Sequence, residues 1–216
     1  LTDLQHQRSV QRRSTQRSKV ISVSIVGYTN AGKSTLFNKL THAQSYAADQ
    51  LFATLDTTTR KVFLSEEGTV VISDTVGFIR ELPHTLVAAF RATLEETVQA
   101  DILLHVIDAS SPNKDEQIDE VNKILKEIGA DTIPQILVFN KIDCVDDTNC
   151  SKSFVRDEYD RIWRIRLSAK TGEGIEFVRQ ALLEAIVENS KKFNEKVVNN
   201  KTEDELGGCT KVRELF

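Results

Sequence analysis

The apolar residues of this chain follow two alternating patterns. Short runs rich in Val, Ile and Leu are typical of buried strands, and longer segments with apolar residues every three or four positions are typical of helices. The expected strands are Val20–Val26, Lys61–Leu64, Thr69–Ser73, Asp101–Val106, Pro134–Phe139 and Ile162–Leu167. The expected helices are Lys33–Leu40, Pro83–Gln99, Pro112–Ile128 and Ile175–Val187. Strands that alternate with helices predict an α/β fold: a mostly parallel six-stranded sheet with one antiparallel edge strand and helices on both faces.

The two ends of the chain lack this patterning. Residues 1–19 are polar and carry an excess of basic side chains, and residues 190–216 are polar and contain Gly207-Gly208. We therefore expect one domain over residues 20–189, preceded by a basic arm that ends an upstream helical region and followed by an appendage. The net charge of −4 hides this asymmetry, since the basic arm precedes an acidic body.

Composition narrows the class of protein. Hydrophobic residues make up 40% and charged residues 28% of the chain, as in ordinary globular proteins. No apolar run approaches the roughly 20 residues that span a bilayer, and no signal peptide opens the chain, so we expect a cytoplasmic protein, with peripheral membrane association as the open alternative. We also expect a monomer. The three cysteines lack metal-ligand spacing. We expect no DNA partner and see no aromatic-plus-basic platform that would indicate RNA binding.

A glycine-rich loop between the first strand and the first helix carries the strongest chemical signal. Residues 27–34 read Gly-Tyr-Thr-Asn-Ala-Gly-Lys-Ser and fit the phosphate-binding pattern G-x-x-x-x-G-K-[ST]. In such a loop, glycines let backbone N–H groups close around phosphates, the lysine neutralises phosphate charge and the serine hydroxyl coordinates Mg²⁺. The residues expected to bind nucleotide here are Gly27, Asn30, Ala31, Gly32, Lys33, Ser34 and Thr35, with Lys33 also catalytic and Ser34 also a metal ligand.

A second signal follows the strand that ends at Ser73. Asp74-Thr75-Val76-Gly77 places an acid at the strand end and a glycine three residues later. Asp74 is expected to hold Mg²⁺, and the Gly77 N–H is expected to meet the γ-phosphate and serve catalysis. The pattern is weak alone and becomes strong forty residues after a phosphate-binding loop.

Two further segments indicate recognition of guanine. Asn140-Lys141-Ile142-Asp143 ends another strand, and the Asp143 carboxylate can accept hydrogen bonds from guanine N1 and N2, which adenine cannot offer. Lys141 can lie over the base, and Asn140 can tie this loop to the phosphate-binding loop. Ser168-Ala169-Lys170, after the last strand, can present a backbone N–H to guanine O6. An ATP-using enzyme is the rival that this base-recognition segment argues against.

These four segments together resemble the Ras-like GTPase superfamily over residues 20–190. A longer run is similar to HflX-type GTPases, which are ribosome-associated factors that bind the large subunit and can separate stalled or dormant ribosomes. The similarity lies in Phe52-Ala53-Thr54-Leu55-Asp56, in Asp74-Thr75-Val76-Gly77-Phe78-Ile79-Arg80, in Leu82-Pro83-His84 and in residues 89–96. Members of that family carry an N-terminal domain and a helical arm upstream of the GTPase module.

The resemblance implies the roles of two further residues. Thr54 would be the mobile-loop threonine that ligates Mg²⁺ in the GTP state and supports catalysis, with Thr57, Thr58 and Thr59 as rivals, and Phe52 would lie at the nucleotide. The family commonly has Asp-Pro-Thr-Thr-Arg where this chain has residues 56–60, Asp-Thr-Thr-Thr-Arg. The expected ligands are therefore GTP or GDP and Mg²⁺, and the expected partner is the large ribosomal subunit.

The expected activity is slow hydrolysis of GTP. Phe78 occupies the position at which Ras has the glutamine that orients the attacking water, and a phenyl ring cannot polarise water. Intrinsic turnover should then lie near or below the ~10⁻⁴ s⁻¹ of unaided Ras, with a partner supplying stimulation. A switch in which GTP occupancy alone controls docking is the alternative that Phe78 keeps open.

Overall fold

The computed structural model describes residues 20–41, 58–65, 68–75, 97–145 and 151–189. These residues contain a seven-stranded sheet with the order β2-β3-β1-β4-β5-β7-β6. The strands are β1 (Ile21–Gly27), β2 (Thr58–Ser65), β3 (Gly68–Asp74), β4 (Ile102–Asp108), β5 (Gln135–Asn140), β6 (Ser153–Arg156) and β7 (Ile162–Arg166). Strands β3, β1, β4, β5 and β7 are parallel, and β2 and β6 are antiparallel edge strands.

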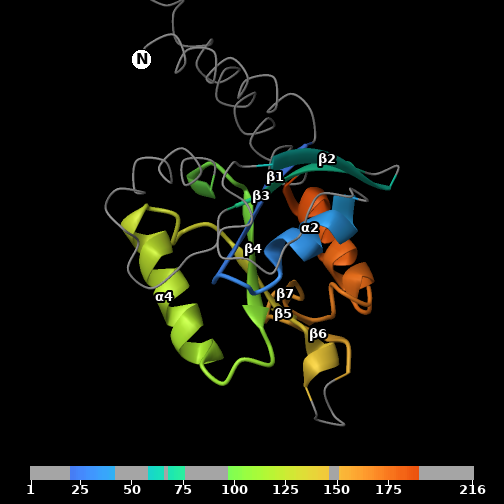
Figure 1. Cartoon of the computed structure of the whole chain (residues 1–216). Helices are drawn as coiled ribbons and strands as arrows, with labels where there is room; N and C mark the ends of the chain where they lie inside the picture. The colour runs from blue at the N-terminus through green and yellow to red at the C-terminus, as the bar shows by residue number, and fades with distance from the viewer. Residues whose placement is uncertain (1–19, 42–57, 66–67, 76–96, 146–150, 190–216) are drawn as a thin grey trace, which may run out of the picture.

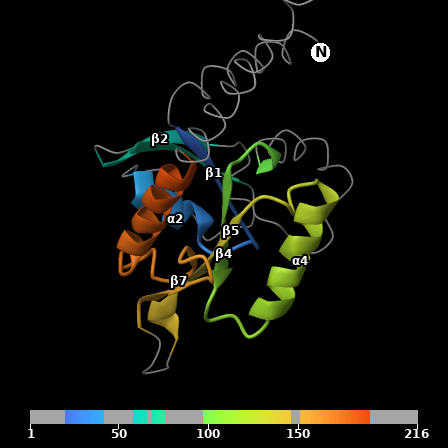
Figure 2. The same ribbon diagram turned by 180° about the vertical axis from the view of Figure 1, so that it is seen from behind.

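Helices cover both faces of this sheet (Figures 1 and 2). Helix α4 (Lys114–Glu127) packs over β4 and β1, and α2 (Lys33–Thr41) lies on the opposite face with the helix of residues 175–189. A 3₁₀ turn, η1 (Ile142–Cys144), follows β5. The sheet therefore separates two hydrophobic cores. One contains Ile25, Phe37 and Leu182, and the other contains Val26, Leu103 and Leu125.

The predicted fold class is confirmed, with one strand more than expected. Strand β6, which the sequence pattern did not indicate, pairs antiparallel with β7 and gives the sheet a second antiparallel edge. Its four residues, Ser-Phe-Val-Arg, are too few to establish a two-residue period. Strand β2 also begins earlier than expected, because residues 58–60 continue the ladder with β3.

Several expected elements lie outside the described residues. These are the terminal segments 1–19 and 190–216 and most of the expected helix Pro83–Gln99. None of the helices in the described part of the chain is long and apolar enough to cross a membrane.

Candidate functional site

The predicted binding segments meet at the carboxyl ends of the parallel strands. The loop of residues 27–32 follows β1, Asp74 ends β3, Asn140 ends β5, and residues 168–170 follow β7. Ligands of open α/β sheets bind outside this edge, where loops from neighbouring strands converge. Thr54, Phe52 and Gly77, which the sequence analysis also assigned to the site, lie outside the described residues.

The phosphate-binding loop depends on its glycines. Gly27 has φ 149° and Gly32 has φ 91°, and both values lie in the region that side chains rarely adopt. A Cβ atom at Gly27 would collide with the carbonyl oxygen of Val106 on β4, and one at Gly32 would collide with the side-chain amide of Asn140. The loop therefore lies tight against β4 and against the end of β5, and its close approach requires residues without side chains.

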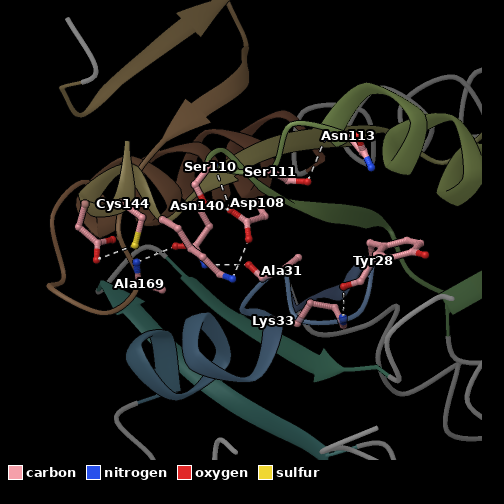
Figure 3. Close-up of polar contacts among 12 residues, drawn as sticks. Tyr28, Ala31, Lys33, Asp108, Ser110, Ser111, Asn113, Asn140, Cys144 and Ala169 are labelled. Atoms are coloured by element: carbon pink, nitrogen blue, oxygen red, sulfur yellow. Dashed lines mark hydrogen bonds and ion pairs between the residues drawn. The ribbon is translucent and has the colours of Figure 1, made fainter. Parts of the chain in front are cut away.

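Lys33 begins α2 and is almost entirely buried, with 6% of its surface exposed. Its Nζ donates to the carbonyl oxygen of Tyr28 at 2.8 Å, across the loop (Figure 3). Burial lowers the pKa of Lys33 to about 8, and the buried carboxylate of Asp74 opposes that shift. A cation held at the start of a helix, against the backbone of the loop, suits a polyphosphate.

Asn140 is the residue that joins the segments. Its side chain is 2% exposed; Nδ2 donates to the carbonyl oxygen of Ala31 at 2.9 Å, and Oδ1 accepts from the N–H of Ala169 at 2.8 Å (Figure 3). The link to the phosphate-binding loop that the sequence analysis expected is therefore present. The link to Ala169 was not foreseen, and through it one amide connects loops that follow three different strands.

Asp143 and Ser168 form the second connection. Ser168 is fully buried, and its Oγ donates to Asp143 Oδ1 at 2.6 Å. This hydrogen bond is the main reason that the pKa of Asp143 lies below its ordinary value, and Lys170 contributes in the same direction. The carboxylate is therefore ionised at neutral pH and can only accept hydrogen bonds, as recognition of guanine N1–H and N2–H requires.

The bonding of residues 168–170 indicates which backbone N–H can reach a ligand. The N–H of Ser168 donates to the carbonyl oxygen of Glu173, and the N–H of Ala169 donates to Asn140. The N–H of Lys170 has no acceptor among the described residues. Lys170 is thus the member of the segment whose N–H is available to a ligand.

Asp108 is a site residue that the sequence analysis missed. It ends β4, and its Oδ2 accepts from Lys141 Nζ at 2.7 Å, while Ser110 donates to Oδ1 through its N–H at 3.0 Å and its Oγ at 2.6 Å (Figure 3). These bonds keep the pKa of Asp108 below its ordinary value despite partial burial. The backbone of Lys141 has a left-handed φ of 64°. The hydrogen bond to Asp108 restrains its ammonium group. A strand-end acid four residues before a proline was the available sequence signal.

The donor set around Lys33 fits Mg²⁺. Ser34 supplies a hydroxyl and Asp74 a buried carboxylate, and Mg²⁺ commonly takes one or two protein oxygens together with phosphate oxygens and water. Within the described ranges no three or more His, Cys, Asp or Glu residues gather to hold a metal ion. Such an ion would therefore depend on the nucleotide's phosphates for its remaining ligands.

Comparison with known proteins gives consistent matches. The protein-family model described as 50S ribosome-binding GTPase matches residues 22–141. GTPase HflX of Escherichia coli K12 is 53% identical over 186 residues, which are 86% of this chain and 43% of that protein. GTPase HflX of Magnetococcus marinus is 47% identical over 186 residues, which are 86% of this chain and 42% of that protein.

Solved structures resemble the chain as well. A GTP-binding protein from the hyperthermophilic archaeon Sulfolobus solfataricus, in complex with GDP, is 28% identical with a TM-score of 0.59, covering 78% of this chain and 53% of that one. The chain spans less than half the length of the two curated relatives.

Proposed function

This chain belongs to the family of 50S ribosome-binding GTPases, and from that membership we propose that it binds GTP or GDP with Mg²⁺ at the carboxyl edge of the sheet and hydrolyses GTP slowly. The large ribosomal subunit is the proposed stimulating partner, and separation or rescue of ribosomes is the proposed purpose. The observation that carries the proposal is the Asn140 amide, which ties the phosphate-binding loop to the segment beside Asp143.

The base is recognised by groups whose protonation is fixed. Asp143, ionised and held by Ser168, accepts from guanine N1–H and N2–H, and the Lys170 N–H donates to O6. The Lys141 side chain, anchored by Asp108, covers one face of the base. In adenine, N1 is an acceptor that would face the Asp143 carboxylate, and the N6 amino group is a donor that would face the Lys170 N–H. Each buried polar group left without a partner costs about 1–3 kcal/mol.

The phosphates are held by the loop and by Lys33. Backbone N–H groups at the start of α2 and the Lys33 ammonium face the β- and γ-phosphates, and negative phosphate charge raises the pKa of Lys33 above the value of about 8 that burial gives it. Ser34 and Asp74 would hold Mg²⁺, with Thr54 as the further ligand expected from the family. Mg²⁺, when bound, neutralises charge on the phosphate oxygens.

Catalysis in this proposal rests on charge stabilisation. Lys33 stabilises the charge that develops on the γ-phosphate, the Gly77 N–H donates to a γ-phosphate oxygen, and Thr54 completes the closed loop in the GTP state. No glutamine follows Gly77, because that position is Phe78. Attack by water would therefore be poorly oriented until a partner reorders these segments, which makes intrinsic turnover slow.

The test is GTP hydrolysis by the 216-residue chain with Mg²⁺, alone and with purified large ribosomal subunits. We expect a basal rate near or below ~10⁻⁴ s⁻¹ that rises at least about tenfold with subunits. Intact GTP binding with no stimulation would contradict stimulation of this chain. Restoring the upstream region found in the longer relatives would then decide between a missing docking segment and a wrong partner.

Phe78 favours one alternative, in which nucleotide occupancy alone controls docking. Exchange of GTP for a non-hydrolysable analogue separates the two. The enzyme proposal predicts that the analogue traps the chain on ribosomes, whereas the occupancy proposal predicts equal rates of release.

A further inference from the structure

The far end of the sheet has a face that neither hydrophobic core includes. Cross-strand partners share a face of a sheet, so the pairing Leu137–Arg164–Val155 and the pairing of Phe139 with Arg166 place these side chains together. Their strand neighbours Ile136, Val138 and Ile165 are buried on the opposite face against the helix of residues 175–189. We call the following residues of β5, β6 and β7 the open face: Leu137, Phe139, Val155, Trp163, Arg164 and Arg166.

No described helix packs on the open face. Helix α4 contacts β4 and β1, and its core contains no residue of β5, β6 or β7 (Figures 1 and 2). Trp163 is 37% exposed and Val155 38% exposed. Exposure of a large apolar ring to water is unfavourable, so an exposed tryptophan is typical of a surface that binds a ligand or a partner.

The aromatic rings of the open face are stacked with an arginine. The Arg164 guanidinium lies over the Trp163 ring, 5.4 Å from its centroid, and over the Phe139 ring, 5.8 Å from its centroid. The β6–β7 ladder shifts register between Val155 and Arg156, which pair with Arg164 and Ile162, so that Trp163 has no partner on β6. At this irregular point of β7 the side chains of Trp163 and Arg164, adjacent in sequence, contact each other. One guanidinium group thus contacts both aromatic rings.

The charge of the open face is not neutralised within the described residues. Nearby, Arg156 at the end of β6 pairs with Glu184, and Arg161, just before β7, pairs with Asp157, each at 2.8 Å. Arg164 and Arg166 have no ion pair with a described residue, and the open face contains no carboxylate. A ligand that supplies both planar groups and negative charge would complement it.

We propose that the open face binds single-stranded RNA, with a base stacked on the exposed indole ring of Trp163 and phosphates paired with Arg164 and Arg166. Aromatic side chains on a sheet face flanked by arginines are how single-stranded nucleic acids are bound without reading their sequence. An acidic protein segment would satisfy the arginines but supply few planar groups, so the exposed indole ring of Trp163 favours RNA. The inference goes beyond the GTPase activity and does not depend on it.

The acidic body sets the strength of this interaction. With a net charge of −4 the whole molecule does not attract a polyanion, so binding must come from stacking and from the two local charges. Binding should therefore be strongest at low ionic strength. Two phosphate contacts predict a slope of about −1.4 in the logarithm of affinity against the logarithm of salt concentration.

Trp163 makes the test direct, because it is the only tryptophan in the chain. A short oligouridylate is titrated into the full chain at low ionic strength while tryptophan fluorescence is recorded, with free N-acetyltryptophanamide as the control for light absorption. We expect saturable quenching, because stacking of a base on the indole ring quenches its emission. In parallel, anisotropy of a labelled oligouridylate gives an affinity for variants without tryptophan.

Two variants and one matched control locate the surface. Trp163→Ala should weaken binding roughly 5- to 150-fold, the range for loss of one stacked base. The double variant Arg164→Glu/Arg166→Glu should abolish quenching and flatten the salt dependence. The control Lys39→Glu/Lys61→Glu makes the same change of charge at exposed lysines of α2 and β2, and it should retain RNA binding. Retained GDP binding in every variant shows that the fold and the nucleotide site are intact.

Three results would overturn the proposal. Absence of quenching in the unaltered chain at low salt would show that RNA does not bind at Trp163. RNA binding that survives both open-face variants would place it elsewhere, for instance on the basic arm at residues 1–19. Equal competition by polyglutamate at matched charge would indicate an acidic protein as the partner.

Discussion

Removal of the Asn140 amide should uncouple the phosphate-binding loop from the base-recognition segment. Asn140→Ala leaves the carbonyl oxygen of Ala31 and the N–H of Ala169 without their present partners in a buried position. A buried backbone group left unsatisfied costs about 1–3 kcal/mol, so the two together predict a loss of roughly 2–6 kcal/mol in stability, less where water enters. A domain stable by only 5–15 kcal/mol would be weakened severely.

The same substitution should weaken GDP binding, since the loops that hold phosphate and base are no longer tied together. The free energy of unfolding comes from urea titration, and GDP affinity comes from a fluorescent analogue. Asn122→Ala, which removes an exposed amide from α4, is the matched control and should leave both quantities unchanged.

Asn140→Asp separates the two hydrogen bonds. The carboxylate can still accept from the Ala169 N–H, but it presents oxygen to the Ala31 carbonyl and buries a charge. We expect a loss at least as large as that of the alanine variant. Losses below about 0.5 kcal/mol in both variants, with GDP affinity unchanged, would refute the reasoning, because surface substitutions alone reach that size.

Three further predictions concern neighbouring groups. Lys33 has a pKa of about 8 in the folded chain against 10.5 in the unfolded chain, so the unfolded state binds more protons between these pH values. Without nucleotide, the free energy of unfolding should therefore rise over that pH window by at most about 3 kcal/mol. Lys33→Met should abolish this rise, which urea midpoints measure. Asp108→Ala should free the Lys141 ammonium and weaken GDP binding by about tenfold, the size of one charge-assisted hydrogen bond, which calorimetry measures; an unchanged affinity would remove Asp108 from the site. Gly32→Ala and Gly129→Ala place alanine at similar positive φ, which costs each variant about 1–2 kcal/mol of stability. Only the Cβ at residue 32 also collides with Asn140, so Gly32→Ala should lose more stability than Gly129→Ala and should alone lose GDP binding; equal affinities would contradict the close packing.

The sequence was sufficient wherever the chemistry is contiguous along the chain. Residues 27–34 and 140–143 carry their signal in local spelling, and each lies at the strand end that the pattern predicted. The hydrogen bond from Asn140 to Ala31 also followed from this placement, because parallel strands deliver their ends to one edge.

Features that depend on strand register, or on the lack of a helix over part of the sheet, could not be predicted from the sequence. Asp108 lies 33 residues before Lys141, and only the pairing of β4 with β5 brings them together. The open face joins Phe139 to Trp163 and Arg164 through the β5–β7 ladder, and its exposure reflects the lack of a described helix above these strands. The sequence analysis therefore saw no aromatic-plus-basic platform where the structure has one.

The most direct test of the central claim is a comparison of GDP and ADP binding by titration calorimetry with Mg²⁺, for the unaltered chain and for Asp143→Asn. We predict that GDP binds at least about a hundredfold more tightly than ADP, as expected where a site is built to pair with polar groups that the competitor lacks. In Asp143→Asn the side-chain amide can donate to a carbonyl oxygen, so xanthosine diphosphate should replace GDP as the preferred ligand. Equal affinity for GDP and ADP, or a base preference that Asp143→Asn does not change, would contradict the account.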